Sequence, residues 1–192
     1  MTPDVTLIMV EGVPARFESS EKIFDRMVAL GNWGAVQYIA QPMTYDEAMR
    51  WEAGGALKYV ETSHALICTW DGFIANPHLW RNEWLQYDYI GAPWPAFWNV
   101  GHRVGNSGFS LQSKRFLKVA RRHALLFEGA GDVWLCRTME GRFRELKIKY
   151  APVEVAAAFS WEHYIEEGLA GPDRSFGFHG WVAGKQPSDY YK

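Results

Sequence analysis

The chain has 192 residues, with 20 basic and 22 acidic side chains for a net charge of −2, and 48% of its residues are hydrophobic. This length and composition predict one folded, soluble domain and exclude a disordered or fibrous chain. Two cysteines exclude a disulfide framework and favour a reducing compartment, and no apolar run reaches the roughly 18 residues that a membrane helix needs. We therefore expect a cytoplasmic protein with no membrane attachment.

The first 70 residues alternate between strand-like and helix-like segments. Apolar, β-branched runs predict strands at residues 5–10, 35–40 and 64–70, and helical periodicity predicts helices at 21–30 and 44–60. Thr44 is the expected cap of the second helix, although two glycines weaken its middle. This strand–helix order predicts an α/β fold in which a mainly parallel sheet is flanked by helices.

The second half of the chain is richer in loops. Pro- and Gly-rich stretches follow residue 76, and Ser113 is the expected cap of a helix that runs to about residue 127. A short helix is predicted at 132–139 and a strand at 147–150. Because no repeat or linker divides the chain, we expect residues 1–192 to form a single domain.

The near-neutral charge hides an asymmetry along the chain. Residues 103–149 hold 11 Lys and Arg against 4 Asp and Glu, a net charge of +7, whereas the remaining residues carry −9. Several of these basic residues, including Lys118 and Arg121, fall on the helix predicted after Ser113. Such a run is either a solvated helix face or a patch that meets a polyanion.

Asp71 is the first candidate for chemistry. It directly follows the strand predicted at 64–70 and so lies at the carboxyl edge of the sheet, where open α/β folds bind ligands. Gly72 beside it allows a phosphate or a metal to approach the backbone, although a turn would explain the same pair. Cys68 and Cys136 are interpreted as core residues, and the chain has neither a P-loop nor a dinucleotide-binding glycine motif.

Six ordered blocks between residues 64 and 180 carry a family resemblance. They are TWDGFIANPHLW (69–80), YDYIGAPW (87–94), VGNSGFSLQSKRFL (104–117), GDVWLC (131–136), YAPVEVAAAFSWE (150–162) and FGFHG (176–180). Together they resemble an uncharacterised glycosyltransferase-like family found in bacterial, phage and fungal proteins. The resemblance implies a compact GT-A type transferase that uses a nucleotide-sugar. Its nucleotide-binding half would span about 1–75, and its acceptor and catalytic half about 76–192.

The resemblance implies a metal-assisted donor site. Asp71 matches the DxD-type carboxylate that holds a divalent ion, Mn²⁺ or Mg²⁺, on the two phosphates of a UDP- or GDP-sugar. His179 matches the late histidine that completes the metal site, although a buried structural role is the other explanation. The first acid of a DxD pair is absent, because residues 69 and 70 are Thr and Trp. Metal binding would therefore rest on fewer ligands.

The resemblance also implies donor-binding and catalytic residues. The segments that would contact the donor comprise Asp71, Gly72, Asn106, Ser107 and Gly108. Asp132 matches the acidic position of a general base that deprotonates the acceptor hydroxyl, so that the sugar would be transferred with inversion. A helix cap is the alternative role for Asp132. Glu162, in the FSWE block, is a further acidic candidate.

Two tryptophans and two basic residues are candidates for contacts with the acceptor. Trp94 and Trp98 lie in a Pro/Gly loop ahead of the GNSGF sequence, where flat rings can stack on a sugar or a base. Other aromatic residues of this region, such as Trp84, have spacing that suits core packing. Lys118 and Arg121 would contact the phosphates of a DNA acceptor.

The acceptor itself stays open at this point. It is either hydroxymethylated, phage-type DNA, whose modified base would reach the pocket by flipping, or a saccharide. A second class of function is a non-catalytic sugar- or nucleic-acid-binding module, derived from a transferase that has lost its DxD pair. No protein partner is inferred.

Overall fold

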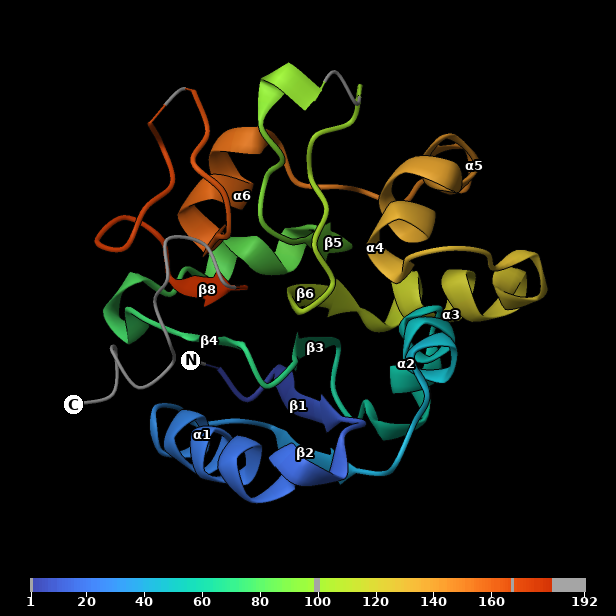
Figure 1. The fold of residues 1–192 in the computed structure, drawn as a ribbon. Helices are drawn as coiled ribbons and strands as arrows, with labels where there is room; N and C mark the ends of the chain where they lie inside the picture. The colour runs from blue at the N-terminus through green and yellow to red at the C-terminus, as the bar shows by residue number, and fades with distance from the viewer. Residues whose placement is uncertain (1, 99–100, 167, 181–192) are drawn as a thin grey trace.

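The computed structural model describes residues 2–98, 101–166 and 168–180 (Figure 1). The strands are β1 (Val5–Glu11), β2 (Ala35–Ala40), β3 (His64–Cys68), β4 (Gly72–Ile74), β5 (Tyr89–Ile90), β6 (Phe109–Ser113), β7 (Ser160–Trp161) and β8 (Gly177–His179). The α-helices are α1 (Phe17–Ala29), α2 (Tyr45–Glu52), α3 (Lys114–His123), α4 (Gly131–Val133), α5 (Glu140–Glu145) and α6 (Val153–Phe159). Short 3-10 helices and one π-helical turn, Trp134–Thr138, join them.

The main sheet has five strands in the order β2-β1-β3-β6-β5. Strand β1 pairs in parallel with β2 and β3, whereas β6 runs antiparallel to both β3 and β5. The α/β fold class and the parallel-rich sheet predicted from the sequence are confirmed. The antiparallel strands β5 and β6 come from the loop-rich part of the chain, where strand periodicity is weak.

The central strands β1 and β3 are buried on both faces, as their near-continuous apolar sequences require, whereas the edge strand β2 is partly exposed. Leu7 and Met9 of β1 belong to the larger core, which also takes Phe24 and Met27 from α1. Ile8 points the other way, into a smaller core completed by α3 and the 3-10 helix Gly55–Tyr59. Figure 1 shows α1 on one side of β1 and β2, with α2 and α3 grouped beside the far end of the sheet.

A small second sheet brings the end of the described chain back to β4. Its order is β4-β8-β7, and the antiparallel register pairs Gly72 with His179. The backbone N–H of Gly180 donates to the carbonyl of Asp71 at 3.1 Å. This pairing places His179 beside Asp71, 108 positions earlier in the chain.

Aromatic side chains build the core between the two sheets. Trp84 is 1% exposed and packs edge-on against Trp80 and Phe159, and close to Phe176. The expectation that Trp84 serves core packing is confirmed. None of the described helices is both long enough and apolar enough to cross a membrane.

Three predicted elements differ from the structure. The helix capped by Thr44 ends at Glu52 rather than near residue 60, because Gly54 adopts a left-handed conformation (φ +100°) and the chain continues as a 3-10 helix. The first helix begins at Phe17, after a 3-10 turn that starts at Pro14. Instead of a strand at 147–150, one bridge joins Tyr150 to β5.

Candidate functional site

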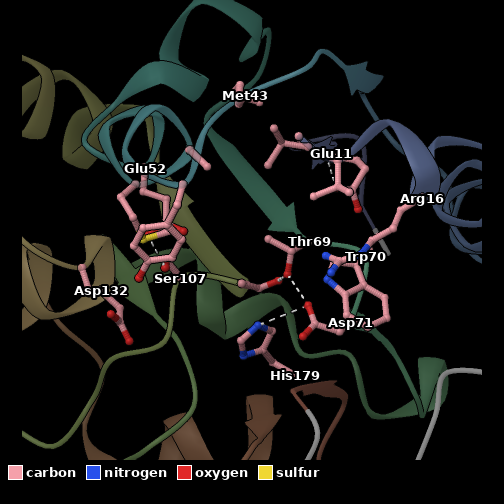
Figure 2. Close-up of a pocket in the computed structure, with 18 of the residues that line it drawn as sticks. Glu11, Arg16, Met43, Glu52, Thr69, Trp70, Asp71, Ser107, Asp132 and His179 are labelled. Atoms are coloured by element: carbon pink, nitrogen blue, oxygen red, sulfur yellow. Dashed lines mark hydrogen bonds and ion pairs between the residues drawn. The ribbon is translucent and has the colours of Figure 1, made fainter.

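A cavity of about 530 Å³ opens at the carboxyl ends of β1 and β3 (Figure 2). Figure 2 shows Asp71 and His179 near its middle, Glu52, Ser107 and Asp132 on one side, and Glu11, Arg16 and Trp70 on the other. Open α/β sheets bind ligands at this edge. The cavity therefore lies where the strand order predicts a ligand site, with side chains from both halves of the chain around it.

Asp71 is held in position by the residue two before it. The Thr69 hydroxyl donates to Asp71 Oδ1 at 2.9 Å and also lies 3.2 Å from the carbonyl of Gly108. On the opposite side, His179 Nε2 lies 3.6 Å from the same Asp71 oxygen. Thr69, which occupies the position of the missing first acid, thus orients the remaining carboxylate.

Glycines allow these segments to approach one another. A Cβ on Gly72 would lie 2.2 Å from the Gly108 carbonyl oxygen, and a Cβ on Gly108 would lie 2.0 Å from His179 Nε2. The expected reason for Gly72 was the approach of a phosphate or a metal. In the structure, the atom that needs this space is the Gly108 carbonyl oxygen, and Gly108 in turn makes room for His179.

His179 has acidic neighbours on both of its ring nitrogens. Its Nδ1 lies 3.3 Å from Glu162 Oε1 and 2.8 Å from the side-chain nitrogen of Asn106. Burial lowers the pKa of His179, but the Glu162 hydrogen bond and the Asp71 charge outweigh it, and the net shift is upward. Asn106, which is 1% exposed and has a φ of +63°, contacts His179 at this ring nitrogen and helps to fix the position of the ring.

The acidic end of the cavity is formed by Glu52, Ser107 and Asp132. Ser107 donates to Glu52 Oε2 at 2.6 Å, and burial raises the pKa of Glu52 to about 7 despite this bond. Burial also raises the pKa of Asp132, and the nearby Glu162 charge adds to the shift. Asp132 lies inside α4 and accepts from the N–H of Val133, whereas the cap position is taken by residue 130.

The opposite end combines apolar surface with one buried, unpaired acceptor. Glu11 is 3% exposed; its Oε1 accepts from the Val13 N–H at 2.7 Å, and its buried Oε2 has no hydrogen-bond partner among the described residues. The Arg16 guanidinium lies over the Trp70 ring, 4.4 Å from its centre. Met43 completes this end. A buried carboxylate oxygen without a partner requires a donor, which a water or a bound ligand supplies.

The donor set for a metal is small. Within the described ranges, no group of three or more His, Cys, Asp and Glu side chains is arranged to enclose a metal ion. Asp71 Oδ1 and His179 Nε2 are nevertheless close enough to share one. Mg²⁺ and Mn²⁺ commonly take one or two protein ligands and complete their shells with phosphates and water. The pair therefore suits an ion held jointly with a diphosphate.

The four residues expected to contact the acceptor lie apart from this cavity. Trp94 is 4% exposed and its ring is covered by Gly105, so neither face is open for stacking. Trp98 is 43% exposed and meets the His163 ring edge-on. Lys118 and Arg121 are exposed on α3 and line two separate hollows.

Sequence reasoning missed three charged residues of the cavity. Glu11 had the same signal as Asp71, since it is an acid at the carboxyl end of a parallel strand and is followed by a glycine. Glu52 had no such signal, because it is one of several acids on an exposed helix and only the end of α2 directs it inward. Arg16 ends the short 3-10 helix before α1, where periodicity says nothing.

Two solved structures share the fold. One is a glycosyltransferase involved in the glycosylation of the major capsid of PBCV-1, with a TM-score of 0.59 and 11% identity, covering 97% of this chain and 96% of that chain. The other is the galactosyltransferase LgtC in complex with donor and acceptor sugar analogues, with a TM-score of 0.51 and 11% identity, covering 94% of this chain and 88% of that chain. At such identities the likeness shows the fold alone.

Sequence comparison identifies the family. No curated protein matches the chain. The model of the family described as "Protein of unknown function (DUF5672)" matches residues 57–179, which is more than half of the chain and includes Asp71, Ser107, Asp132 and His179. The chain therefore belongs to the DUF5672 family, and its fold is that of GT-A glycosyltransferases.

Proposed function

We propose that this protein is a glycosyltransferase that moves a sugar from a nucleotide-sugar donor to a hydroxyl acceptor. The observation that carries the proposal is the cavity at the carboxyl ends of β1 and β3, in which Asp71 and His179 lie between an apolar end and an acidic end. This arrangement matches the three parts of such a donor, which are a flat nucleoside, a charged diphosphate and a hydroxyl-rich sugar.

The nucleoside fits the end formed by Glu11, Arg16 and Met43. Glu11 Oε2, the unpaired acceptor, suits an N–H of the base or a hydroxyl of the ribose. Arg16 would supply positive charge for the phosphates, and its stacking on Trp70 limits its freedom. Both UDP and GDP carry suitable donors, so the two nucleotides are tested side by side.

The diphosphate fits beside Asp71 and His179. These two residues would hold Mn²⁺ or Mg²⁺, and the ion would neutralise the charge that develops on the leaving diphosphate. Thr69 keeps the Asp71 carboxylate turned toward His179. Glu162 at Nδ1 fixes the ring from the other side, as carboxylates commonly do for histidines that bind metals.

Asp132 is the proposed general base for the acceptor hydroxyl. Its pKa is raised by burial, which makes the carboxylate a stronger base than an exposed aspartate. A direct displacement assisted by this base inverts the anomeric configuration. The coupling constant of the anomeric proton in the product, measured by NMR, tests that outcome.

A saccharide is the proposed acceptor, in preference to hydroxymethylated DNA. The basic residues expected to contact DNA, Lys118 and Arg121, line hollows other than the site cavity. Transfer of labelled sugar to an oligosaccharide panel, compared with hydroxymethylcytosine-containing DNA, distinguishes the two. Transfer to DNA that is lost on charge reversal of Lys118 and Arg121, and that falls steeply with salt, would reverse this choice.

Release of nucleoside diphosphate from UDP- and GDP-sugars with Mn²⁺ tests the reaction class. We expect turnover in the wild type, and a loss of about 100-fold or more in D71A and D132A. D46A is the matched control, because Asp46 is exposed on α2. Donor binding without turnover would favour the non-catalytic binding module, and full turnover in both site variants would reject the assignment.

A further inference from the structure

Glu52 lies at the point where the proposed donor would place its sugar. It is the last residue of α2, and it lines the cavity beside Ser107 and Asp132, on the side of Asp71 opposite to the Arg16 end (Figure 2). If the diphosphate binds at Asp71 and the nucleoside binds at the Arg16 end, the sugar must extend toward Glu52. Glu11, which lines the same cavity, has a buried Oε2 that lacks a donor, and a bound ligand would satisfy it.

The Glu52 carboxyl is fixed by two contacts. Ser107 donates to its Oε2, which leaves Oε1 for a hydroxyl of the ligand. A Cβ on Gly131 would lie 1.7 Å from the same Oε2, so the carboxyl packs directly on the backbone that precedes Asp132. A carboxyl held by a neighbouring hydroxyl and by close packing is pre-organised to bind, because little side-chain freedom remains to be lost.

Carboxylates outnumber cationic groups around this end. Glu52 and Asp132 line it, and Glu162 lies near enough for its charge to act on Asp132. Among the described residues that line the cavity, the one Lys or Arg side chain is Arg16, at the opposite end. The histidine near this end, His179, is already paired with Asp71 and Glu162. A carboxylate on the sugar would therefore lose its hydration among like charges without gaining a free cationic partner, which disfavours its binding.

We propose that Glu52, oriented by Ser107, hydrogen-bonds hydroxyls of the donor sugar and makes the site select a neutral hexose over a uronic acid. This inference rests on the proposed donor site and names the class of sugar that the site accepts. Glu52 is a specificity-determining residue in this account. The proton of the acceptor goes to Asp132, not to Glu52.

Binding measurements by calorimetry in the presence of Mn²⁺ separate the sugar from the nucleotide, and they are made at about pH 8, where Glu52 is mostly ionised. UDP and GDP are compared first, and the nucleotide that binds selects the pair of donors, UDP-glucose with UDP-glucuronate or GDP-mannose with GDP-mannuronate. In the wild type, the neutral donor should bind about tenfold or more tightly than the uronate. E52A should weaken binding of the neutral donor about tenfold and change the affinity for the bare nucleoside diphosphate less than about twofold.

E52Q keeps the shape and hydrogen-bonding capacity of Glu52 without its charge. This variant should bind the neutral donor within about threefold of the wild type, and it should reduce the discrimination against the uronate. S107A should weaken binding of the neutral donor less than E52A does, because this substitution releases the Glu52 carboxyl from its hydrogen bond but does not remove the carboxyl. D46A, on the exposed face of the same helix, should match the wild type, and circular dichroism checks that every variant is folded.

The possible failures are distinguishable. If neither UDP nor GDP binds, the proposed donor site is wrong, and the inference about Glu52, which rests on it, is wrong as well. If a nucleoside diphosphate binds but E52A weakens the binding of the diphosphate and of the sugar donor equally, Glu52 does not contact the sugar. Equal binding of glucose and glucuronate donors by the wild type would overturn the claim about the sugar class, with the donor site intact.

Discussion

Gly108 leaves no room for a side chain beside His179, because a Cβ there would lie 2.0 Å from Nε2. G108A should displace His179 from Asp71 and cost about 1–3 kcal/mol of unfolding free energy. It should also weaken Mn²⁺-dependent binding of UDP or GDP by tenfold or more, since one of the two proposed protein ligands moves. Urea denaturation and calorimetry measure the two effects.

The control for this substitution is Gly141→Ala. A Cβ at Gly141, within α5, meets nothing within 4 Å, so alanine should be neutral or slightly stabilising there. If G108A binds the nucleotide as the wild type does, then either His179 shifts without cost or it is not a ligand. The role of the Gly108–His179 contact would then be structural.

Glu52 makes the stability of the protein depend on pH. Its pKa is raised from 4.5 to about 7 by burial. Between those values the unfolded chain has lost the proton and the folded chain keeps it, so stability is fully present below pH 4.5 and falls as the pH rises to 7. At about 1.4 kcal/mol per pKa unit, the loss approaches 3 kcal/mol.

E52Q removes this dependence, because an amide does not ionise. Its unfolding free energy relative to the wild type should therefore rise by up to about 3 kcal/mol between pH 4.5 and pH 8, as measured by urea titration at several pH values. E21Q, at an exposed position of α1, should show no comparable trend. A constant difference between E52Q and the wild type across the range would contradict the raised pKa.

Two helices begin with hydroxyl caps that differ in burial. Removing the buried cap should lower the unfolding free energy more than removing the exposed one. The Thr44 hydroxyl accepts from the Glu47 N–H in an exposed capping box, so T44A should cost about 1 kcal/mol. Ser113 Oγ accepts from the Phe116 N–H and also donates to buried Asp88 at 2.6 Å. S113A should cost about 2–3 kcal/mol, because the Asp88 carboxylate loses a buried partner. Equal unfolding free energies for the two variants in urea would contradict this ranking.

The elements predicted well are those whose local signals are complete. Both capped helices start where Thr44 and Ser113 place them, and the strand at 35–40 has the predicted bounds. The antiparallel strands β5 and β6 were missed, because their pairing is set by partners in the sheet rather than by their own short sequences. Helix ends are harder to predict when a glycine such as Gly54 adopts a left-handed turn.

The residues of the site divide in the same way, into those with a local sequence signal and those placed by distant partners. Asp71 was recognisable from its position after a strand, and Glu11 carried the same signal. His179 lies 108 positions away from Asp71, and its proximity depends on the register of β4 and β8, which no local pattern encodes. Only a family resemblance brought His179 into consideration, and neither pattern nor resemblance indicated Glu52.

At the scale of the whole molecule, the cavity joins segments from both halves of the chain. The region expected to bind the nucleotide, residues 1–75, supplies Glu11, Glu52 and Asp71, and the second half supplies Ser107, Asp132 and His179. A ligand that spans these residues bridges distant parts of the fold. Its binding energy must therefore add to the global stability and not merely to the order of one loop.

Thermal unfolding should show that metal and nucleotide stabilise this fold together. Because the proposed metal site has only two protein ligands in the described chain, Asp71 and His179, Mn²⁺ alone should raise the melting temperature by less than about 1 °C. Mn²⁺ with UDP or GDP at 100 times the dissociation constant should add about 2.7 kcal/mol, or about 5–10 °C for a chain of this length. EDTA should reverse the shift, D71N should abolish it and D46N should leave it intact. An equal shift with Mn²⁺ alone would mean that the protein encloses the ion by itself, and the diphosphate would then lose its proposed place as a partner in holding the metal.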